Sequence, residues 1–208
     1  MKRLFLSIEE PDLREFLVRQ RWFGAKSREL SHARVVAAPV VREEEPLLAL
    51  ALVEIRFHES THELYHVPIG LRREWDDPIA TVDGWKAYDA LADPELSRAL
   101  LELMRSQADV AGGEAAVEFR SSGELAPAAS DVRPMGAEQS NSSLVFGEQL
   151  VLKVYRRLEP GVNPELELLR FLSEREKPAL RSPVQCIGVR TPSRSPRKML
   201  SPIPISSP

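Results

Sequence analysis

The sequence is poor in features that mark several large classes of protein. It has one cysteine, Cys186, which excludes an internal disulfide framework and indicates a reducing compartment. No apolar run approaches the roughly 18–20 residues needed to cross a membrane, and the longest, residues 46–53, has the length of a strand. Acidic residues at Glu9, Glu10 and Asp12 interrupt the basic start before a signal sequence could form. These absences predict a cytoplasmic protein without a membrane partner.

An excess of charge of one sign is also missing. The net charge is −3 and the isoelectric point is about 5.9, whereas a general nucleic-acid-binding protein is usually basic. We therefore expect no nucleic-acid partner. Hydrophobic residues make up 43% of the chain, enough for a core, and 208 residues correspond to one large or two small domains.

Patterning in the first part of the chain predicts a helix followed by an antiparallel meander. Ser7 and Glu10 have the spacing of a capping box for a helix over residues 8–20. Turn-like charged segments then separate three runs with the composition of strands. These runs are Ala33–Val41, Leu47–Phe57 and Glu63–Leu71.

Two helix-start signals follow the meander. Asp83 predicts a short helix that carries Trp85 and Tyr88 on one side. The run Asp93-Pro94-Glu95 combines a capping residue, a proline and an acid, and predicts a longer amphipathic helix. A strand over Ala115–Arg120 completes this part.

The rest of the chain divides into a patterned and an unpatterned segment. The patterned segment, up to about residue 176, predicts three strands and a helix that starts at Asn163-Pro164-Glu165. The expected strands are Ser130–Ser140, Ser143–Phe146 and Gln149–Arg156. Residues 177–208 contain seven prolines and six serines without helical or strand periodicity, and we expect this tail to be disordered.

A lysine within an apolar strand is the first chemical signal. Lys153 lies in the run Val151–Tyr155, and a buried ammonium group requires an anionic partner. In kinase-like folds such a lysine holds nucleotide phosphates and pairs with a helix glutamate. Glu165 and Glu167 are candidates on nearly opposite helix faces, about 200° apart, and we select Glu167 because it lies deeper in the helix. The alternative is a solvent-facing lysine with both acids on the surface.

A polar segment before this strand could contact phosphates. Gln139, Ser140, Asn141 and Ser142 offer backbone N–H groups and side-chain donors in a predicted turn. The segment lacks the glycine patterns of protein kinases and P-loop enzymes. An ordinary hairpin is the competing interpretation, and from the residues alone it is favoured.

Other chemically suggestive residues favour structural interpretations. Arg156 and Arg157 could meet phosphates, but a solvated position at the sheet edge is favoured. The aromatic run Arg21–Lys26 could bind a sugar or a partner, although a hydrophobic plug at a helix end is commoner. Cys186 has no paired base and receives no catalytic role. Three histidines spaced four apart do not form a convincing metal site; they are His58, His62 and His66.

Several of these blocks together resemble the N-terminal portion of the maltokinase family. The run Gln20–Lys26 resembles the family's tryptophan-phenylalanine-glycine-x-lysine signature, and Tyr65–Ile69 resembles its tyrosine-x-x-proline strand. Further blocks resemble its nucleotide-binding lobe: Glu138–Ser143, Leu152-Lys153, Arg156-Arg157 and Gly161–Glu167. The resemblance covers roughly residues 1–175.

The resemblance implies an α+β fold and an ATP-dependent sugar kinase. Residues 1–125 would form the cap domain, an antiparallel sheet with helices, residues 126–176 a partial kinase-like N-lobe, and residues 177–208 the disordered tail. The family phosphorylates maltose to maltose 1-phosphate with ATP and Mg²⁺, which feeds glycogen and α-glucan synthesis. Gln139 to Ser142 would form the phosphate turn, Lys153 would hold phosphates, and Glu167 would be its ion-pair partner.

The chain also departs from the family. Phosphoryl transfer needs a carboxylate for the acceptor and ligands for Mg²⁺, which related kinases supply from a C-lobe. This sequence has no histidine after His66 and no aspartate after Asp131, so we assign it no catalytic and no metal-binding residue. We therefore expect a truncated maltokinase that is inactive alone; a shifted reading frame or a broken gene would produce such a tail. The alternatives are a non-catalytic module that docks on a trehalose synthase and a nonfunctional gene fragment.

Overall fold

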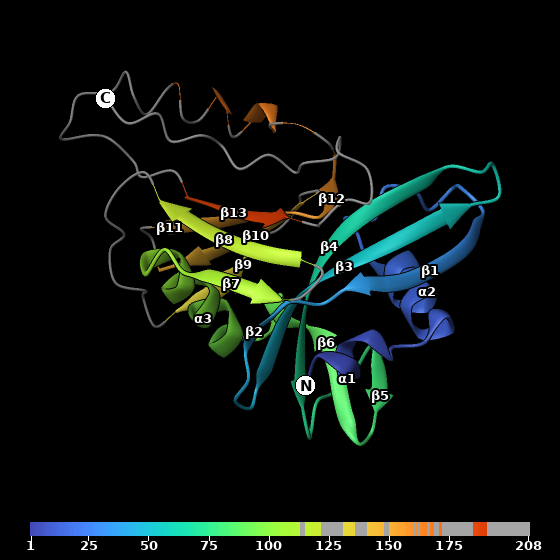
Figure 1. Ribbon diagram of the computed structural model, residues 1–208, viewed down its shortest axis with the longest axis horizontal. Coiled ribbons are helices and arrows are strands. Elements are labelled where there is room, and N and C mark those ends of the chain that lie inside the picture. Colours follow the sequence, from blue (N-terminus) through green and yellow to red (C-terminus); the bar gives the residue numbers. More distant parts are fainter. Residues whose placement is uncertain are drawn as a thin grey trace. The chain divides into compact units, whose positions relative to one another are not determined.

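The computed structural model describes residues 1–112, 115–121, 131–135, 141–147, 150–159, 161, 163–165, 167, 168, 171 and 185–190 (Figure 1). The chain forms two compact units, and each is discontinuous in sequence. Unit one comprises Met1–Ala99 and Ala128–Leu158, and unit two comprises Leu100–Pro127 and Glu159–Pro208. The continuous domains expected from the sequence follow a different division, and their boundaries stay a prediction.

The N-terminal segment of unit one forms two helices. These are α1 (Lys2–Leu6) and α2 (Glu10–Arg19), and the second corresponds to the helix expected over residues 8–20. No described helix has both the length and the apolar composition that would let it span a membrane.

The predicted capping box at the start of α2 is wrong. The Ser7 hydroxyl donates a hydrogen bond of 2.8 Å to the Arg3 carbonyl, so Ser7 ends α1 instead of starting α2. The N-cap of α2 is Glu9, which makes no side-chain capping bond, and Pro11 occupies the first turn. Ser7 lies two residues before this N-cap, so its hydroxyl is not in the capping position of α2.

Unit one contains a seven-stranded antiparallel sheet in the order β1-β3-β4-β6-β5, with β2 paired to β3 and β12 paired to β4 (Figure 1). The expected meander is confirmed, because β1, β3 and β4 pair in sequence order. The strands are β1 (Leu30–Ala37), β2 (Val40–Arg42), β3 (Leu47–Phe57), β4 (His62–Arg72), β5 (Ala80–Val82), β6 (Trp85–Asp89) and β12 (Arg157–Leu158).

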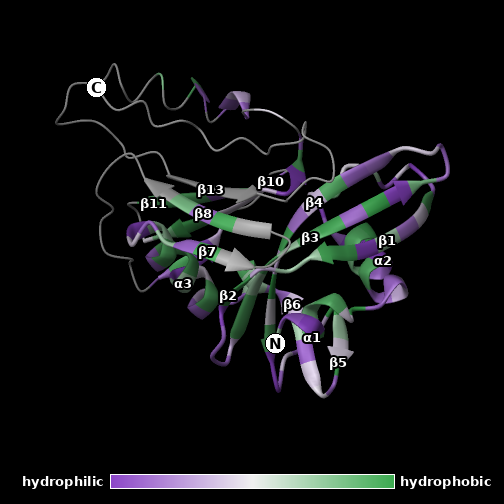
Figure 2. Ribbon diagram, viewed as in Figure 1, coloured by the Kyte–Doolittle hydropathy of each residue, from purple (hydrophilic) through white to green (hydrophobic). Residues whose placement is uncertain are grey.

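The core of unit one is built around β3. Residues 47–53 are all buried, and this unbroken apolar run is typical of a strand that is covered on both faces (Figure 2). The two N-terminal helices contribute side chains to the same cluster as β1, β3 and β4. Their buried members are Phe5, Leu13, Phe16 and Leu17.

The helix predicted to begin at Asp83 is wrong. Asp83 and Gly84 form the two-residue turn of the hairpin β5–β6, with φ angles of 49° and 77°. A 3₁₀ turn, η1 (Ala90–Ala92), follows β6. Asp-Gly is a strong signal for this hairpin turn, and the apolar spacing around it fits a strand as well as a helix.

The helix-start signal at residues 93–95 is confirmed. Helix α3 (Pro94–Arg105) begins after Asp93, whose carboxylate accepts a hydrogen bond of 2.8 Å from the backbone N–H of Glu95. The division between the two units falls within this helix. Its buried residues are Leu96, Ser97, Leu100, Leu101 and Met104.

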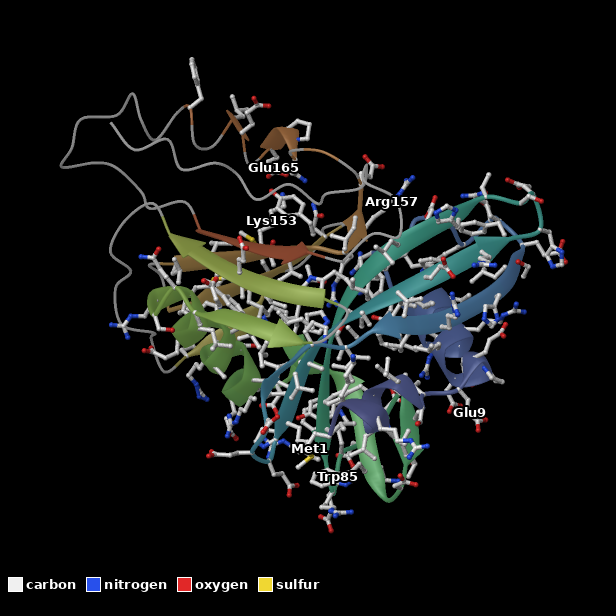
Figure 3. The ribbon with its side chains drawn as sticks, in the orientation of Figure 1. Met1, Glu9, Trp85, Lys153, Arg157 and Glu165 are labelled. Carbon is white, nitrogen blue, oxygen red and sulfur yellow. The ribbon has the colours of Figure 1, made fainter. Side chains whose placement is uncertain are left out.

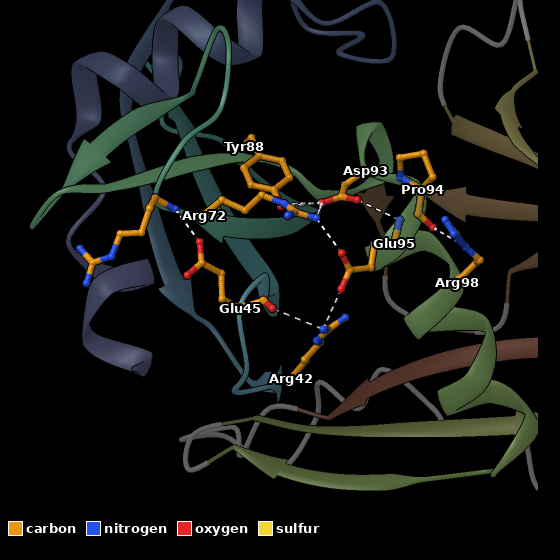
Figure 4. Close-up of polar contacts among 9 residues, drawn as sticks. Arg42, Glu45, Arg72, Tyr88, Asp93, Pro94, Glu95 and Arg98 are labelled. Atoms are coloured by element: carbon orange, nitrogen blue, oxygen red, sulfur yellow. Dashed lines mark hydrogen bonds and ion pairs between the residues drawn. The ribbon is translucent and has the colours of Figure 1, made fainter.

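A polar network holds the first turn of α3 to the sheet (Figure 4). Arg72 on β4 lies 2.9 Å from the carboxylates of both Asp93 and Glu95. The Tyr88 hydroxyl donates to Asp93 over 2.8 Å, and Arg42 on β2 pairs with Glu95 at 2.8 Å. Strands far apart in sequence are thus joined through the acids that start one helix.

Two three-stranded sheets complete the described part of the fold. In unit one the order is β11-β10-β9, formed by β9 (Val132–Pro134), β10 (Asn141–Phe146) and β11 (Leu150–Tyr155). In unit two the order is β13-β8-β7, formed by β7 (Asp109–Gly112), β8 (Ala115–Ser121) and β13 (Gln185–Arg190). The architecture is therefore α+β with antiparallel sheets.

Strand β13 corrects part of the expectation for the tail. Residues 185–190 were expected to be disordered, yet they pair with β8 from Gln185↔Ser121 to Arg190↔Ala116. Ile187 and Val189 are β-branched residues at alternate positions, which favours extended structure. The other residues of the segment 177–208 lie outside the described part of the chain.

Candidate functional site

The hairpin β10–β11 carries the residues with predicted phosphate chemistry. Its register places Ser143 opposite Lys153, and Asn141 opposite Tyr155. Because side chains alternate between the faces of a strand, these four residues share one face. The opposite face carries buried apolar side chains, namely Leu144, Phe146, Leu152 and Val154.

Lys153 lies at the centre of this face on the edge strand β11 (Figure 3). Its side chain is half-buried, and its Nζ lies 5.7 Å from the ring centroid of Tyr155. The neighbouring Val151 is 51% exposed, so this face is partly open to water. The ammonium group therefore carries less desolvation cost than the sequence argument assumed, and it lies beside the polar side chain of Ser143.

The described part of the chain contains two of the four residues of the predicted phosphate turn. Asn141 and Ser142 are the first two residues of β10, and only Asn141 shares the face of Lys153. The Ser142 hydroxyl lies on the other face and accepts a hydrogen bond of 2.9 Å from Nε of Arg156. Gln139 and Ser140 lie outside the described residues.

The predicted partner of Lys153 belongs to the other unit. Asn163 starts a helical segment, and its side-chain oxygen accepts a hydrogen bond of 3.0 Å from the N–H of Glu165. The N–H of Glu167 donates to the Asn163 carbonyl at 3.0 Å, which continues the helical turn. Glu165 and Glu167 are both exposed, so burial does not separate the two candidates. The pair of Lys153 with Glu167 stays a prediction.

The position of Arg156 differs from the one expected from the sequence. It was expected to be solvated, but it is 1% exposed and is among the largest fully buried side chains. The signal was present in the sequence. Arg156 follows Leu152 and Val154 at alternate positions, so the alternation of side chains along β11 directs it to the same buried face.

Three segments of unit one meet at the guanidinium of Arg156. Its Nη2 pairs with Asp89, at the end of β6, over 2.6 Å, and its Nε donates to Ser142 on β10. The guanidinium carbon lies 4.7 Å from the ring centroid of Trp22, a cation–π contact. Nη1 is buried and has no hydrogen-bond partner among the described residues.

Arg157 matches the expected surface position. It is half exposed and pairs with Glu63 at 3.2 Å (Figure 3). Glu63 also pairs with Arg28 at 3.0 Å and accepts a hydrogen bond of 2.7 Å from the Tyr65 hydroxyl. Burial, together with the neighbouring Glu63 carboxylate, raises the pKa of Tyr65 well above its ordinary value.

The aromatic run after α2 forms the hydrophobic plug favoured from the sequence. Trp22 and Phe23 are buried, and their ring centroids lie 5.9 Å and 5.3 Å from that of Tyr65. Phe16 on α2 contacts Trp22 edge-on, with centroids 6.1 Å apart. The faces of these rings contact other protein side chains. Trp22 contacts Arg156, so its ring is not available to bind a sugar.

The three histidines at spacing four do not gather around a metal. His58 and His62 are exposed, whereas His66 is buried, and no group of three or more potential metal ligands occurs among the described residues. Burial and the nearby Arg156 guanidinium lower the pKa of His66 to about 3. His66 is therefore neutral within the folded unit at ordinary pH.

Comparison with known families identifies one part of the chain. Residues 16–93 match the family model described as the maltokinase N-terminal cap domain. The match spans less than half of the 208 residues, from α2 to the N-cap of α3, and ends before the hairpin that carries Lys153. It includes Trp22, Tyr65 and Asp89.

Proposed function

Because residues 16–93 form a maltokinase N-terminal cap domain, we propose that the chain joins this cap to the nucleotide-gripping strands of a maltokinase-type lobe. The family reaction would be the ATP-dependent phosphorylation of maltose to maltose 1-phosphate, in the service of glycogen synthesis. Its site of action would be the cytoplasm.

The observation that carries this proposal is the position of Lys153. It lies on a partly open strand face beside Asn141 and Ser143, in a hairpin that follows the cap along the chain. An ammonium group with amide and hydroxyl neighbours is suited to phosphate oxygens, which accept hydrogen bonds and carry negative charge. Gln139, Ser140 and Ser142 remain candidates for the preceding turn, and Glu167 for the ion pair with Lys153.

The proposed role of the hairpin is binding and not turnover. The described residues contain no cluster of carboxylates that could hold the Mg²⁺ that accompanies ATP in the family. We therefore assign Mg²⁺ no ligand here and derive no chemical step through it. In this proposal Lys153 neutralises α- and β-phosphate oxygens, and Asn141 orients them through its amide.

Titration of the full chain with a fluorescent ATP analogue tests the proposal. Substitution Lys153→Ala should weaken binding about tenfold to a hundredfold, the range expected for one hydrogen bond to a charged group. Lys86→Ala is the matched control, since Lys86 is a strand lysine that donates to Thr81 within the hairpin β5–β6. Equal affinities for the unmodified chain and Lys153→Ala would contradict the proposed site.

A second proposal rests on the cap itself, the part of the chain with an identified family. The cap would act as a docking module for another enzyme of the same route, with a trehalose synthase as the candidate partner. Size-exclusion chromatography of the two proteins together measures this directly. Co-elution that survives Lys153→Ala would favour docking, whereas separate elution would count against it.

A further inference from the structure

On the side of β4 that faces away from β3, two strands pair with β4 in succession. A gap separates the two paired segments. Strand β12 pairs with Leu64 and Tyr65, and β6 pairs with the segment from Ile69 to Arg72. Residues 66–68, which we call the β4 gap, lack a partner strand on this edge within the described part of the chain. The backbone N–H and C=O groups of these buried residues therefore need hydrogen-bond partners other than a neighbouring strand.

The chain satisfies the β4 gap in two ways. The N–H of His66 donates to the carbonyl of Arg156 at 2.6 Å. Backbone groups of alternate residues point to the same side of a strand, so the nitrogen of Pro68 lies on this side too. Proline has no N–H, so position 68 leaves no donor unpaired at the gap. The proline of the tyrosine-x-x-proline pattern thus has a physical explanation.

The side chain of Arg156, as well as its backbone carbonyl, makes contacts near the β4 gap. Its guanidinium contacts Trp22, Asp89 and Ser142, which come from a loop, from the end of β6 and from β10. The side chain of Arg156 is 2% exposed and that of Asp89 is 16% exposed. A buried cation of this kind is tolerated only where an anion and further acceptors are fixed around it.

The surroundings favour a guanidinium over an ammonium group. A planar guanidinium can stack on the indole of Trp22 while its edge donates to Asp89 and Ser142 in two directions. A lysine at this position carries one compact charge and cannot stack in the same way. The site is therefore selective in shape as well as in charge.

We propose that Trp22, Asp89 and Ser142 form a guanidinium-binding site whose ligand is Arg156 of the same chain. By this contact the segment Asn141–Leu158 is fastened to the sheet formed by residues 30–89. Two of the three site residues, Trp22 and Asp89, lie within the matched cap. The inference concerns the fold of unit one and does not depend on nucleotide binding.

Chemical rescue of the full-length Arg156→Ala variant tests this proposal. Truncation leaves Asp89 without its partner in a mostly buried place, and the unfolding equilibrium constant should rise roughly 100-fold or more. Methylguanidinium at millimolar concentration should raise the melting temperature of Arg156→Ala and leave that of the unmodified chain unchanged or lower. Methylammonium should not rescue, because it cannot stack and donate together.

Arg157→Ala is the matched control, since Arg157 is the next residue and is half exposed. It should lose little stability and should not respond to methylguanidinium. The proposal is overturned if Arg156→Ala is as stable as Arg157→Ala, or if methylguanidinium affects both variants equally.

A second variant keeps the proposal testable if Arg156→Ala does not fold. Asp89→Asn keeps the side-chain oxygen that accepts from the N–H of Leu91 at 3.1 Å, so it removes the charge and preserves the start of η1. Hydrogen exchange at the His66 amide should then accelerate at least tenfold, because that amide donates to Arg156. Unchanged protection of His66 in Asp89→Asn would overturn the proposal.

Discussion

At the scale of single residues, Gly70 on β4 occupies a position that no side chain can share. A Cβ atom at this position would lie 2.6 Å from Leu96 Cδ1 and from the nearest ring carbon of Tyr88. Tyr88 cannot move aside easily, since its hydroxyl donates a hydrogen bond to Asp93 and its ring stacks on Trp75 with centroids 3.8 Å apart. We expect Gly70→Ala to lower the free energy of unfolding by about 3 kcal/mol.

Urea unfolding followed by tryptophan fluorescence measures this loss. All three tryptophans (Trp22, Trp75 and Trp85) belong to unit one, so their signal reports that unit. Gly24→Ala is the control, because a Cβ atom at Gly24 meets nothing within 4 Å. A Gly70→Ala variant as stable as Gly24→Ala would show that Tyr88 and Leu96 repack without cost.

Burial of individual polar residues was only partly predictable from the sequence. The carboxylate of Asp93 was found because its role as a helix cap is local and depends on the next two residues. The position of Arg156 was missed because its anion, Asp89, is 67 positions away and no local pattern joins them. Strand alternation gave the direction of the Arg156 side chain, but a cation is assigned to the surface unless its partner is known.

At the scale of secondary-structure elements, the hairpin β5–β6 depends on its two-residue turn. Gly84 has a φ of 77° and Asp83 a φ of 49°, a pair of positive values that fits a type I′ turn. Alanine at position 84 would be strained by roughly 1 kcal/mol, and its Cβ would also lie 3.4 Å from Nη1 of Arg73. We expect Gly84→Ala to destabilise the hairpin by about that amount.

Hydrogen exchange at the amides of β5 and β6 is the suitable measurement, because it separates local opening from global unfolding. Exchange should accelerate in this hairpin and remain unchanged in the long hairpin β3–β4. Gly84→Asn provides the comparison, since asparagine tolerates positive φ better than alanine. Equal exchange in the alanine and asparagine variants would mean that the turn accommodates a side chain without strain.

Elements with strong local patterns were predicted well, and the errors arose where two patterns compete. The long strands β3 and β4 follow from apolar runs bounded by charged turns, and α3 follows from its capping sequence. The segment 83–91 has apolar spacing that suits both a helix and a strand, and Asp83 can cap a helix or form a turn. Its pairing with β4 decides the outcome, and that contact is not local.

At the scale of the whole molecule, the sequence did not reveal which distant segments fold together. Strand β12 pairs with β4, which lies far upstream in the sequence: Leu158 pairs with Leu64 and Arg157 with Tyr65. Unit one therefore includes both the matched cap and the hairpin that carries Lys153. The boundary near residue 125, which the resemblance implies, stays a prediction, and the compact units follow long-range pairing.

The acid stability of unit one should depend on His66. Its folded-state pKa is lowered to about 3 by burial and by Arg156, while an unfolded histidine titrates near 6.5. Between pH 3 and pH 6.5, the unfolded chain holds one more proton on His66 than the folded chain does. The contribution of His66 to the free energy of unfolding is therefore fully present above pH 6.5 and is lost as the pH decreases toward 3. One proton corresponds to about 1.4 kcal/mol per pH unit, so this group alone should cost about 2 kcal/mol between pH 7 and pH 5.

Substitution His66→Gln removes this titration and leaves the carboxylates of the unit in place. Whatever its stability at pH 7, the variant should lose about 2 kcal/mol less than the unmodified chain when the pH is lowered to 5. Urea midpoints at a series of pH values, read from tryptophan fluorescence, measure the two slopes. His58→Gln, at an exposed position, should keep the slope of the unmodified chain. Parallel slopes for His66→Gln and the unmodified chain would mean that His66 becomes protonated without opening the fold, and that the surroundings of Arg156 tolerate a second positive charge.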